Sequence, residues 1–129
     1  MNRAEDQKKV NELLKKFKNV EFKPEGLGAL EFNVEMFSEK FKVEEIPFRI
    51  ERVSLQVADK VLKDNLNKIE DMEKVLATFI AFPKEATKLN YFNLDYNAMS
   101  DIAELIALFQ STPFSFTEAA RNSTEEVTK

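Results

Sequence analysis

Apolar side chains recur at helical spacing near the N-terminus. Val10, Leu13, Leu14 and Phe17 follow the i, i+3, i+4, i+7 spacing that places side chains on one face of a helix. The opposite face carries mostly lysines, but acidic residues interrupt it, which argues against a basic helix made for an acidic partner. The pattern predicts a helix over residues 3–19 that packs its apolar stripe on the core.

The strongest helical signal lies between Ile69 and Phe109, where two apolar stripes meet at an aromatic corner, Pro83 to Tyr91-Phe92. A proline is well suited to a first helical position, so a short helical piece is expected from Pro83 to Asn90. The stripes comprise Ile69, Met72, Val75, Leu76, Phe79 and Ile80, and then Met99, Ile102, Leu105, Ile106 and Phe109. They predict two amphipathic helices.

The second of these helices has recognisable start and stop signals. An Asn or Asp side chain commonly caps a helix N-terminus, and Asn93, Asp95 and Asn97 are the candidates here. The residue before a proline disfavours the helical conformation, so the helix should end before Pro113.

Between the helical stretches, apolar and polar residues alternate as in strands. Val20 and Phe22 precede a turn at residues 24–28, and a second strand over residues 29–34 would complete a hairpin. Further alternation at residues 41–43 and 48–50 flanks Glu44-Glu45-Ile46-Pro47, which favours another β-hairpin or two edge strands. A strand is expected to give way to a helix near Ser54, and residues 62–68 read as a polar hinge.

These elements predict an α+β fold that is mainly helical, with a small antiparallel β element in the N-terminal half; an all-α fold is the alternative. The length fits a single domain, residues 1–120. That domain would comprise the N-terminal helix, a β-rich segment at residues 20–57 and a helical C-terminal half at residues 58–111. The polar residues 121–129 are expected to be a flexible tail.

Composition indicates a packed core and an interleaved charged surface. Residues of the hydrophobic class make up 43% of the chain, too many for a disordered segment, and the twelve phenylalanines should mark the core. The formal net charge is −4. The chain therefore lacks the excess of basic residues that is typical of a nucleic-acid-binding domain. Phenylalanines beside lysines, at Phe17, Phe22 and Phe41, are therefore expected to be core residues and not a base-stacking platform.

The residue types that carry most catalysis are missing. The chain has no His and no Cys, which removes the usual general base, the thiolate nucleophile and the ligands of structural zinc sites. Gly26 and Gly28 lack the rest of a phosphate-binding loop, and the hinge at residues 62–68 lacks the glycine of a calcium loop. Adjacent carboxylates, such as Glu44-Glu45, Glu70-Asp71 and Glu125-Glu126, arise freely on an acidic surface. We expect no enzyme, no metal and no cofactor.

The sequence shows neither a signal peptide nor an apolar run long enough to span a bilayer. A cytoplasmic protein without membrane or nucleic-acid partners is expected.

The stretch from Ile69 to Phe109 resembles the tail assembly chaperones of long-tailed bacteriophages or prophages of Gram-positive hosts. The resembling parts are the apolar helix at residues 75–80, Pro83-Lys84-Glu85-Ala86, Tyr91-Phe92 and the helix at residues 102–109. The likeness covers about the C-terminal 60 residues. Its pattern of helix, proline, aromatic residue and helix is one that many small helical proteins share.

The resemblance implies a binding protein of the host cytoplasm. Such chaperones hold the long, hydrophobic, helical tape measure protein in solution until tail tube protein subunits assemble around it. Partners implied are therefore the tape measure protein and the tail tube protein, with self-association as a further possibility. The alternatives are a structural or adaptor subunit of a phage particle and, less favoured, a small enzyme with a carboxylate–metal site.

A protein that holds a helical client needs an apolar groove with adaptable side chains, and Met and Phe supply these. The candidate client-binding residues are Met72, Phe79, Phe82, Met99 and Phe109. For each of them, an ordinary place in the core is the favoured interpretation. Phe82 is the favoured one because it lies beside the main stripe and not on it.

Overall fold

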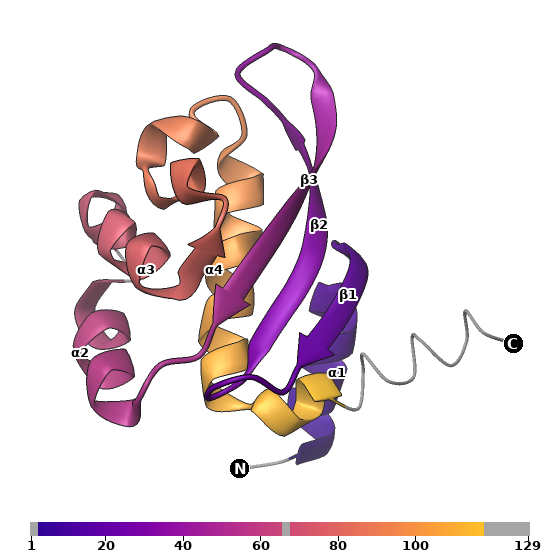
Figure 1. Cartoon of the computed structure of the whole chain (residues 1–129), viewed down its shortest axis with the longest axis vertical. Helices are drawn as coiled ribbons and strands as arrows, with labels where there is room; N and C mark the ends of the chain where they lie inside the picture. Colours follow the sequence, from indigo (N-terminus) through magenta and orange to yellow (C-terminus); the bar gives the residue numbers. More distant parts are fainter. Residues whose placement is uncertain (1–2, 66–67, 118–129) are drawn as a thin grey trace, which may run out of the picture.

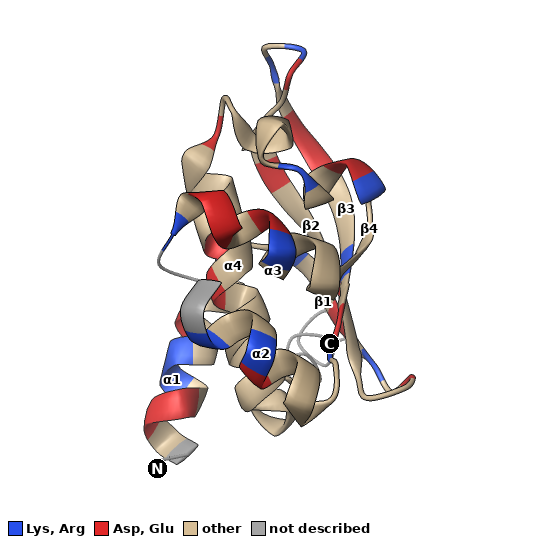
Figure 2. Cartoon of the chain, turned by 90° about the vertical axis from the view of Figure 1, so that its left-hand side faces the viewer, with Lys and Arg blue, Asp and Glu red and all other residues tan. Residues whose placement is uncertain are grey.

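A four-stranded antiparallel sheet forms one layer of the molecule, and helices cover one of its faces (Figure 1). The computed structural model describes residues 3–65 and 68–117. The strands lie in chain order: β1 (Lys18–Lys23), β2 (Ala29–Phe37), β3 (Val43–Glu51) and β4 (Ile80–Phe82). The helices are α1 (Arg3–Leu14), α2 (Leu55–Asn65), α3 (Met72–Phe79) and α4 (Tyr96–Ser111), with 3-10 turns η1 (Ile69–Asp71), η2 (Lys84–Thr87) and η3 (Leu89–Phe92). Figure 2 shows the two layers from the side, with the sheet on the right and the helices on the left.

The fold is α+β, but the expected balance between helix and strand is wrong. The sheet is a full layer and not a small β element, since β2 and β3 are each nine residues long and pair along their whole length. The sheet also takes a strand from the C-terminal half, because β4 pairs with β3 at Arg49 and Ile50. The all-α alternative is wrong for the same reason.

The first hairpin is confirmed, with β1 and β2 joined through residues 24–28. Gly28 has a φ of 110°, in a region that side chains with a Cβ rarely adopt. A Cβ on Gly28 would also come within 3.5 Å of Phe22 and of Arg52, and within 3.7 Å of Phe109. This glycine therefore lets the turn pass close to the end of the core.

The second hairpin does not have its turn at residues 44–47. The turn spans residues 38–42, where the Ser38 amide donates to the Lys42 carbonyl at 2.9 Å, and β3 then runs unbroken through Pro47. Pro47 is tolerated because it lies beyond the stretch where β3 pairs with β4, so β3 has one neighbouring strand there. The charged residues that suggested a turn instead lie along this strand.

Several helix boundaries follow the sequence signals. The Asp95 carboxylate accepts from the Ala98 amide at the start of α4, and α4 ends at Ser111, before Pro113. The β3 strand gives way to α2 after Ser54, whose hydroxyl accepts from the Val57 amide. By contrast, α1 ends at Leu14 and not at residue 19.

The other expected segments divide differently. The stripe at residues 69–80 splits into η1, α3 and β4, so Ile80 lies in a strand. Pro83 precedes η2 in an extended conformation, and the following helical piece consists of two 3-10 turns. The expected hinge is helical through Asn65, and residues 66–67 lie outside the described residues, as does the expected tail at residues 121–129.

The core lies between the inner face of the sheet and the helices. Alternate residues of β2 and β3 point toward α4 and are buried, as are the apolar side chains on the sheet-facing side of α4. The core members from these three elements are Leu30, Phe32, Val34, Met36, Phe48, Ile50, Ile102, Leu105, Ile106 and Phe109. The apolar stripe of α1 also packs on this core, as expected, with Val10 and Leu13 buried, and Phe17, which lies beyond the end of α1, is buried as well.

A buried polar contact ties the end of α4 to the segment after β3. The Gln110 side chain accepts from the Val53 amide and donates to the Val53 carbonyl, both at 2.9 Å. The Arg52 guanidinium donates to the Gln110 carbonyl at 3.0 Å and to the Leu27 carbonyl at 2.8 Å. These bonds satisfy backbone groups that no sheet or helix ladder reaches.

Within the described residues, none of the helices combines the length and apolar character needed to cross a membrane.

Candidate functional site

The five residues proposed from the sequence do not form one surface. Phe79 and Phe109 are core residues with exposed fractions of 2% and 1%. Met72 and Met99 are also largely buried, but both line the same surface groove. Phe82 is 53% exposed and does not line that groove. The structure therefore brings together two of the five and leaves Phe82 as a separate exposed ring.

The groove lies between the start of α3 and the outer side of α4, and we call it the α3–α4 groove. Its volume is about 280 Å³. The lining residues from α4 recur at three- and four-residue spacing, which keeps them on one side of that helix. The groove is lined by Met72, Tyr96, Met99, Ser100, Ala103, Glu104 and Ala107.

Small side chains keep this side of α4 hollow. Ser100, Ala103 and Ala107 leave the α4 backbone close to the surface, while Met72, Met99 and Tyr96 supply larger apolar walls. Such a surface lets another helix or a single ring approach closely, and methionine side chains adapt to different shapes. Glu104 is the one charged residue among the described lining residues. The groove is suited to binding an apolar segment that carries a positive charge at its edge.

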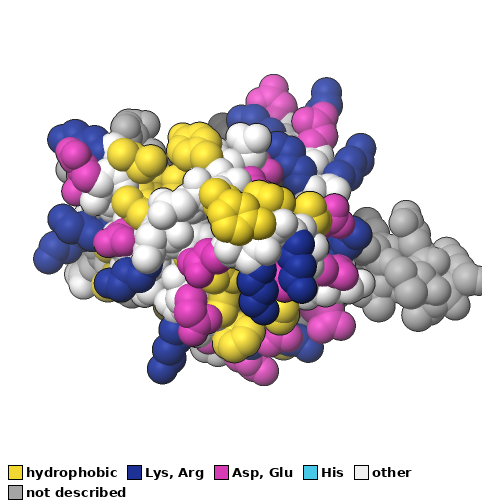
Figure 3. Space-filling view, turned by 90° about the horizontal axis from the view of Figure 1, so that it is seen from above, with side chains coloured by type: hydrophobic (Ala, Val, Ile, Leu, Met, Phe, Trp, Pro, Cys, Tyr) yellow, Lys and Arg dark blue, Asp and Glu magenta, His cyan; other side chains and the backbone are white. Residues whose placement is uncertain are grey.

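A second exposed apolar feature is the end of the β2–β3 hairpin, which we call the finger (residues 37–44). Figure 1 shows it projecting beyond the helices. Phe41 and Val43 are 73% and 63% exposed, and the Phe41 ring contacts the Phe37 ring edge-on at 6.2 Å between centroids. Phe41 was expected to be a core residue, and that prediction is wrong. Seen from above, apolar side chains gather in the middle of this end of the molecule among basic and acidic side chains (Figure 3).

Charged and polar groups shape the finger. The Lys40 amide donates to the Ser38 hydroxyl at 3.2 Å. A hydrogen bond from Ser38, and then the charges of Lys40 and Lys42, hold the pKa of Glu44 below its usual value. At the base of the finger, the Phe37 amide donates to Asp95 at 2.9 Å, which joins it to the start of α4. The turn itself is thus well ordered by local bonds.

The uncovered face of the sheet is charged, and three carboxylates gather around one arginine there. The Arg49 guanidinium forms ion pairs with Glu25, Glu31 and Glu51 at 2.6, 2.7 and 3.0 Å. The hydrogen bonds that Arg49 donates to Glu25, Glu51 and Glu31 raise the pKa of its guanidinium. Across the whole described chain, no group of three or more His, Cys, Asp or Glu residues is arranged to hold a metal ion.

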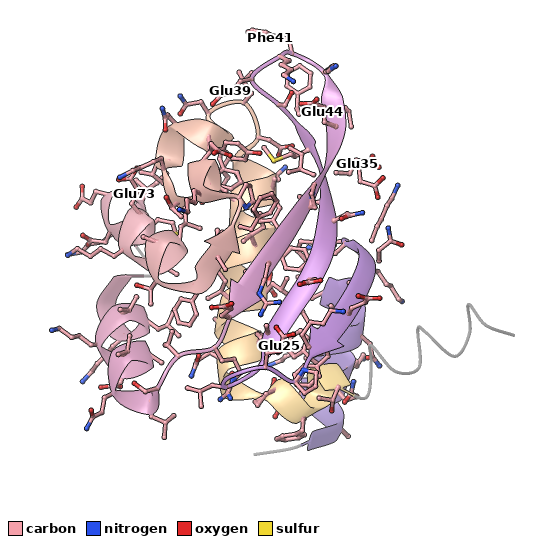
Figure 4. The ribbon with its side chains drawn as sticks, viewed as in Figure 1. Glu25, Glu35, Glu39, Phe41, Glu44 and Glu73 are labelled. Atoms are coloured by element: carbon pink, nitrogen blue, oxygen red, sulfur yellow. The ribbon has the colours of Figure 1, made fainter. Side chains whose placement is uncertain are left out.

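Tyr91 of η3 lies near the finger and has an altered acidity. Burial, and then the charges of Glu85, Glu39 and Glu44, raise its pKa above the ordinary value of 10.0. Glu39 and Glu44 belong to the finger and Glu85 to η2. The pKa of Tyr91 therefore depends on how the finger is placed relative to η2 and η3. Figure 4 shows Glu39 and Glu44 on the two sides of the hairpin.

The Tyr91 environment predicts a pH dependence of stability. A raised folded-state pKa contributes stability that is complete below pH 10.0 and is lost as the pH rises through the folded-state pKa. The free energy of unfolding should therefore fall above pH 10.0, and Tyr91→Phe should remove part of that fall. Urea unfolding of both proteins between about pH 8 and 11 measures the difference. The exposed Tyr96→Phe is the control; an equal effect there would contradict the assignment to Tyr91.

The sequence reasoning missed both the groove and the finger. Selecting methionine and phenylalanine as adaptable residues identified Met72 and Met99 but not the small residues of α4 that form the floor of the groove. The spacing of Tyr96, Ser100, Ala103 and Ala107, at i, i+4, i+7 and i+11, was a readable signal of a hollow helix face. The finger was hidden because Phe41 and Val43 alternate as strand residues do.

Comparison with known proteins found no matching family model, no matching curated protein and no matching solved structure. The resemblance to tail assembly chaperones stays a prediction.

Proposed function

We propose that this chain is a non-enzymatic binding protein of the tail assembly chaperone type. It would hold apolar helical segments of a phage tape measure protein in the host cytoplasm and release them as tail tube protein subunits arrive. The observation that carries the proposal is the α3–α4 groove, which has adaptable methionine walls and a floor of small residues. A client helix laid against α4 would bury its own apolar stripe there.

The groove also restricts which client segments would bind well. A helix approaches α4 closely only where both helices carry small residues at the crossing. Glu104 favours a segment with a lysine or arginine beside its apolar stripe, because opposite charges at the rim add specificity. The preferred client is therefore an amphipathic helix with small residues and a flanking basic residue.

Co-expression with the tape measure protein tests this proposal. The client is expected to move from the insoluble to the soluble fraction and to co-purify with this chain. If it stays insoluble and nothing co-purifies, the chaperone function is wrong. A gene neighbourhood without a large helical reading frame downstream would count against it as well.

A groove variant separates the α3–α4 groove from the rest of the surface. Ser100 is exposed on α4, so Ser100→Arg should leave the fold intact while placing a long side chain across the floor of the groove and a cation beside Glu104, four residues further along the helix. The arginine would take up space that the client helix needs and would pair with the carboxylate that favours a basic client. A loss of about 1.4 kcal/mol in binding free energy is about tenfold in affinity. Client recovery should fall by about that factor or more. Leu55→Ser, at a residue 79% exposed on α2, is the matched control and should retain the client.

The second candidate, a structural or adaptor subunit of a phage particle, is favoured by the finger. A projecting hairpin with an exposed aromatic ring is a form that assembly contacts use. Co-purification with tail or capsid proteins, without any effect on tape measure solubility, would favour this candidate over the chaperone.

A further inference from the structure

Phe41 combines two unfavourable features at the end of the finger. Its φ of 60° lies in the left-handed region, which bulky side chains rarely adopt, and its side chain is 73% exposed to water. An asparagine or glycine would satisfy this backbone conformation with less strain. Strain and exposure together at one aromatic residue point to a position that contacts another molecule.

The finger presents this ring between two positive charges. Lys40 and Lys42 flank Phe41, and their side chains are 74% and 62% exposed. Both ammonium groups lie 3.9 Å from a Glu44 carboxylate oxygen, which is a loose pairing that leaves them available to another carboxylate. The partner surface should therefore be an apolar hollow with a carboxylate at its rim.

The α3–α4 groove has that composition. Its walls are Met72, Met99 and Tyr96, and methionine sulfur and tyrosine both make favourable contacts with an aromatic ring. The Glu104 carboxylate lies at this site and has no ion-pair partner among the described residues. A ring flanked by lysines and a groove with a glutamate are complementary in shape and in charge.

A finger does not reach the groove of its own chain. It projects past the end of the helical layer, with Phe41 at its far end (Figures 1 and 4). The groove lies along α3 and α4 in the other layer. An intramolecular contact would require β2 and β3 to fold back on themselves, although they pair along their whole length.

We infer that the finger of one copy of this chain binds in the α3–α4 groove of a second copy. The contact is heterologous, since finger and groove are different surfaces, so copies add head to tail. A single ring and two lysines make a small interface, which places the association in the weak, concentration-dependent class. The inference rests on the groove being a docking site, as the proposed function does. It adds that, in the free protein, the finger of another copy covers this groove and a client helix displaces it.

Sedimentation velocity over a range of about 10 to 500 μM tests the association, in the weak range expected of a small interface. The unaltered chain should show a sedimentation coefficient that rises with concentration. Phe41→Asn should remain monomeric and folded, because asparagine tolerates the left-handed conformation. Ser100→Arg should also remain monomeric, because it places a cation where the lysines of the finger would bind. Leu55→Ser removes an equally exposed apolar side chain elsewhere and should associate as the unaltered chain does.

Mixing the two monomeric variants identifies the geometry of the contact. Phe41→Asn retains an intact groove, and Ser100→Arg retains an intact finger. Their mixture should form a one-to-one dimer that grows no further, because each pair has one working finger and one working groove. A mixture that stays monomeric overturns the inference, as does association that persists in Phe41→Asn or an unaltered chain that is monomeric at every concentration.

The failure of this inference differs from that of the proposed function. With the competing finger removed, Phe41→Asn should recover more tape measure protein than the unaltered chain does. A chain that holds the client but never self-associates would retain the function and lose the inference. A chain that self-associates through finger and groove but holds no client would support the inference and contradict the proposed function.

Discussion

Replacing Phe109 with alanine is expected to lower the free energy of unfolding by about 3–5 kcal/mol. The Phe109 side chain is 1% exposed and lies where α4 meets the β1–β2 end of the core. Its ring contacts Phe22 at 6.2 Å and Phe116 at 5.2 Å between centroids, both edge-on. Alanine would remove these contacts and leave a cavity that the paired strands cannot close, because close-packed cores relax only in part.

Phe82→Ala is the matched control, because both phenylalanines were candidate client-binding residues from the sequence. Phe82 is 53% exposed on the three-residue strand β4, so its loss should change the free energy of unfolding by less than about 1 kcal/mol. Chemical denaturation of the two variants measures the contrast. A small effect at Phe109, or effects of equal size at both positions, would contradict the assignment of Phe109 to the core.

That contrast shows what periodicity reveals and what it leaves open. The stripe on α4 identified a helix and its caps, because the spacing of apolar residues and the Asp95 side chain act locally. Periodicity does not reveal which apolar positions stay exposed. Phe82 pairs with Arg49, whose side chain lies on the uncovered face of the sheet, whereas Ile80 pairs with the core residue Ile50, and the register shifts between the two pairs.

The sheet was underestimated for a related reason. The residues from Glu44 to Pro47 read as a turn, since charged residues and a proline are uncommon inside strands. Their alternation nevertheless continues into Phe48 and Ile50, which face the core. The outward positions are stabilised by tertiary contacts such as the Arg49 ion pairs, which come from separate segments of the chain. Sequence spacing carries no information about such pairs.

The groove was only partly predictable. Met72 and Met99 were found because methionine is a usual residue at adaptable surfaces. The small residues of α4 have a visible spacing, but whether they face a neighbouring helix or open space depends on where α3 and α1 pack. The packing leaves this side of α4 hollow, and it is this hollow that supports the proposed binding of a helix.

Among the polar side chains, Gln110 is the one whose replacement should lower the free energy of unfolding the most. Gln110→Ala removes both hydrogen bonds to the Val53 backbone, and the side chain is only 5% exposed. An unsatisfied buried backbone group costs about 1–3 kcal/mol. Water reaches part of the half-buried Val53 segment, so we expect a total loss of about 2–4 kcal/mol in the free energy of unfolding.

The adjacent residue gives the control for this prediction. Ser111 is exposed, and its hydroxyl bonds only to carbonyls within α4, so Ser111→Ala should change stability by no more than about 0.5 kcal/mol. Amide hydrogen exchange makes the test specific: the Val53 amide should lose protection in Gln110→Ala and keep it in Ser111→Ala. Full protection of Val53 in Gln110→Ala would show that the link from α4 to the segment after β3 does not depend on this side chain.

Gln110→Ala should also affect the α3–α4 groove, because the bonds between Gln110 and Val53 hold the C-terminal end of α4, and the outer side of α4 forms the groove. A loosened α4 end should weaken client binding less than Ser100→Arg does, since four of the six lining residues from α4 lie in the first half of the helix.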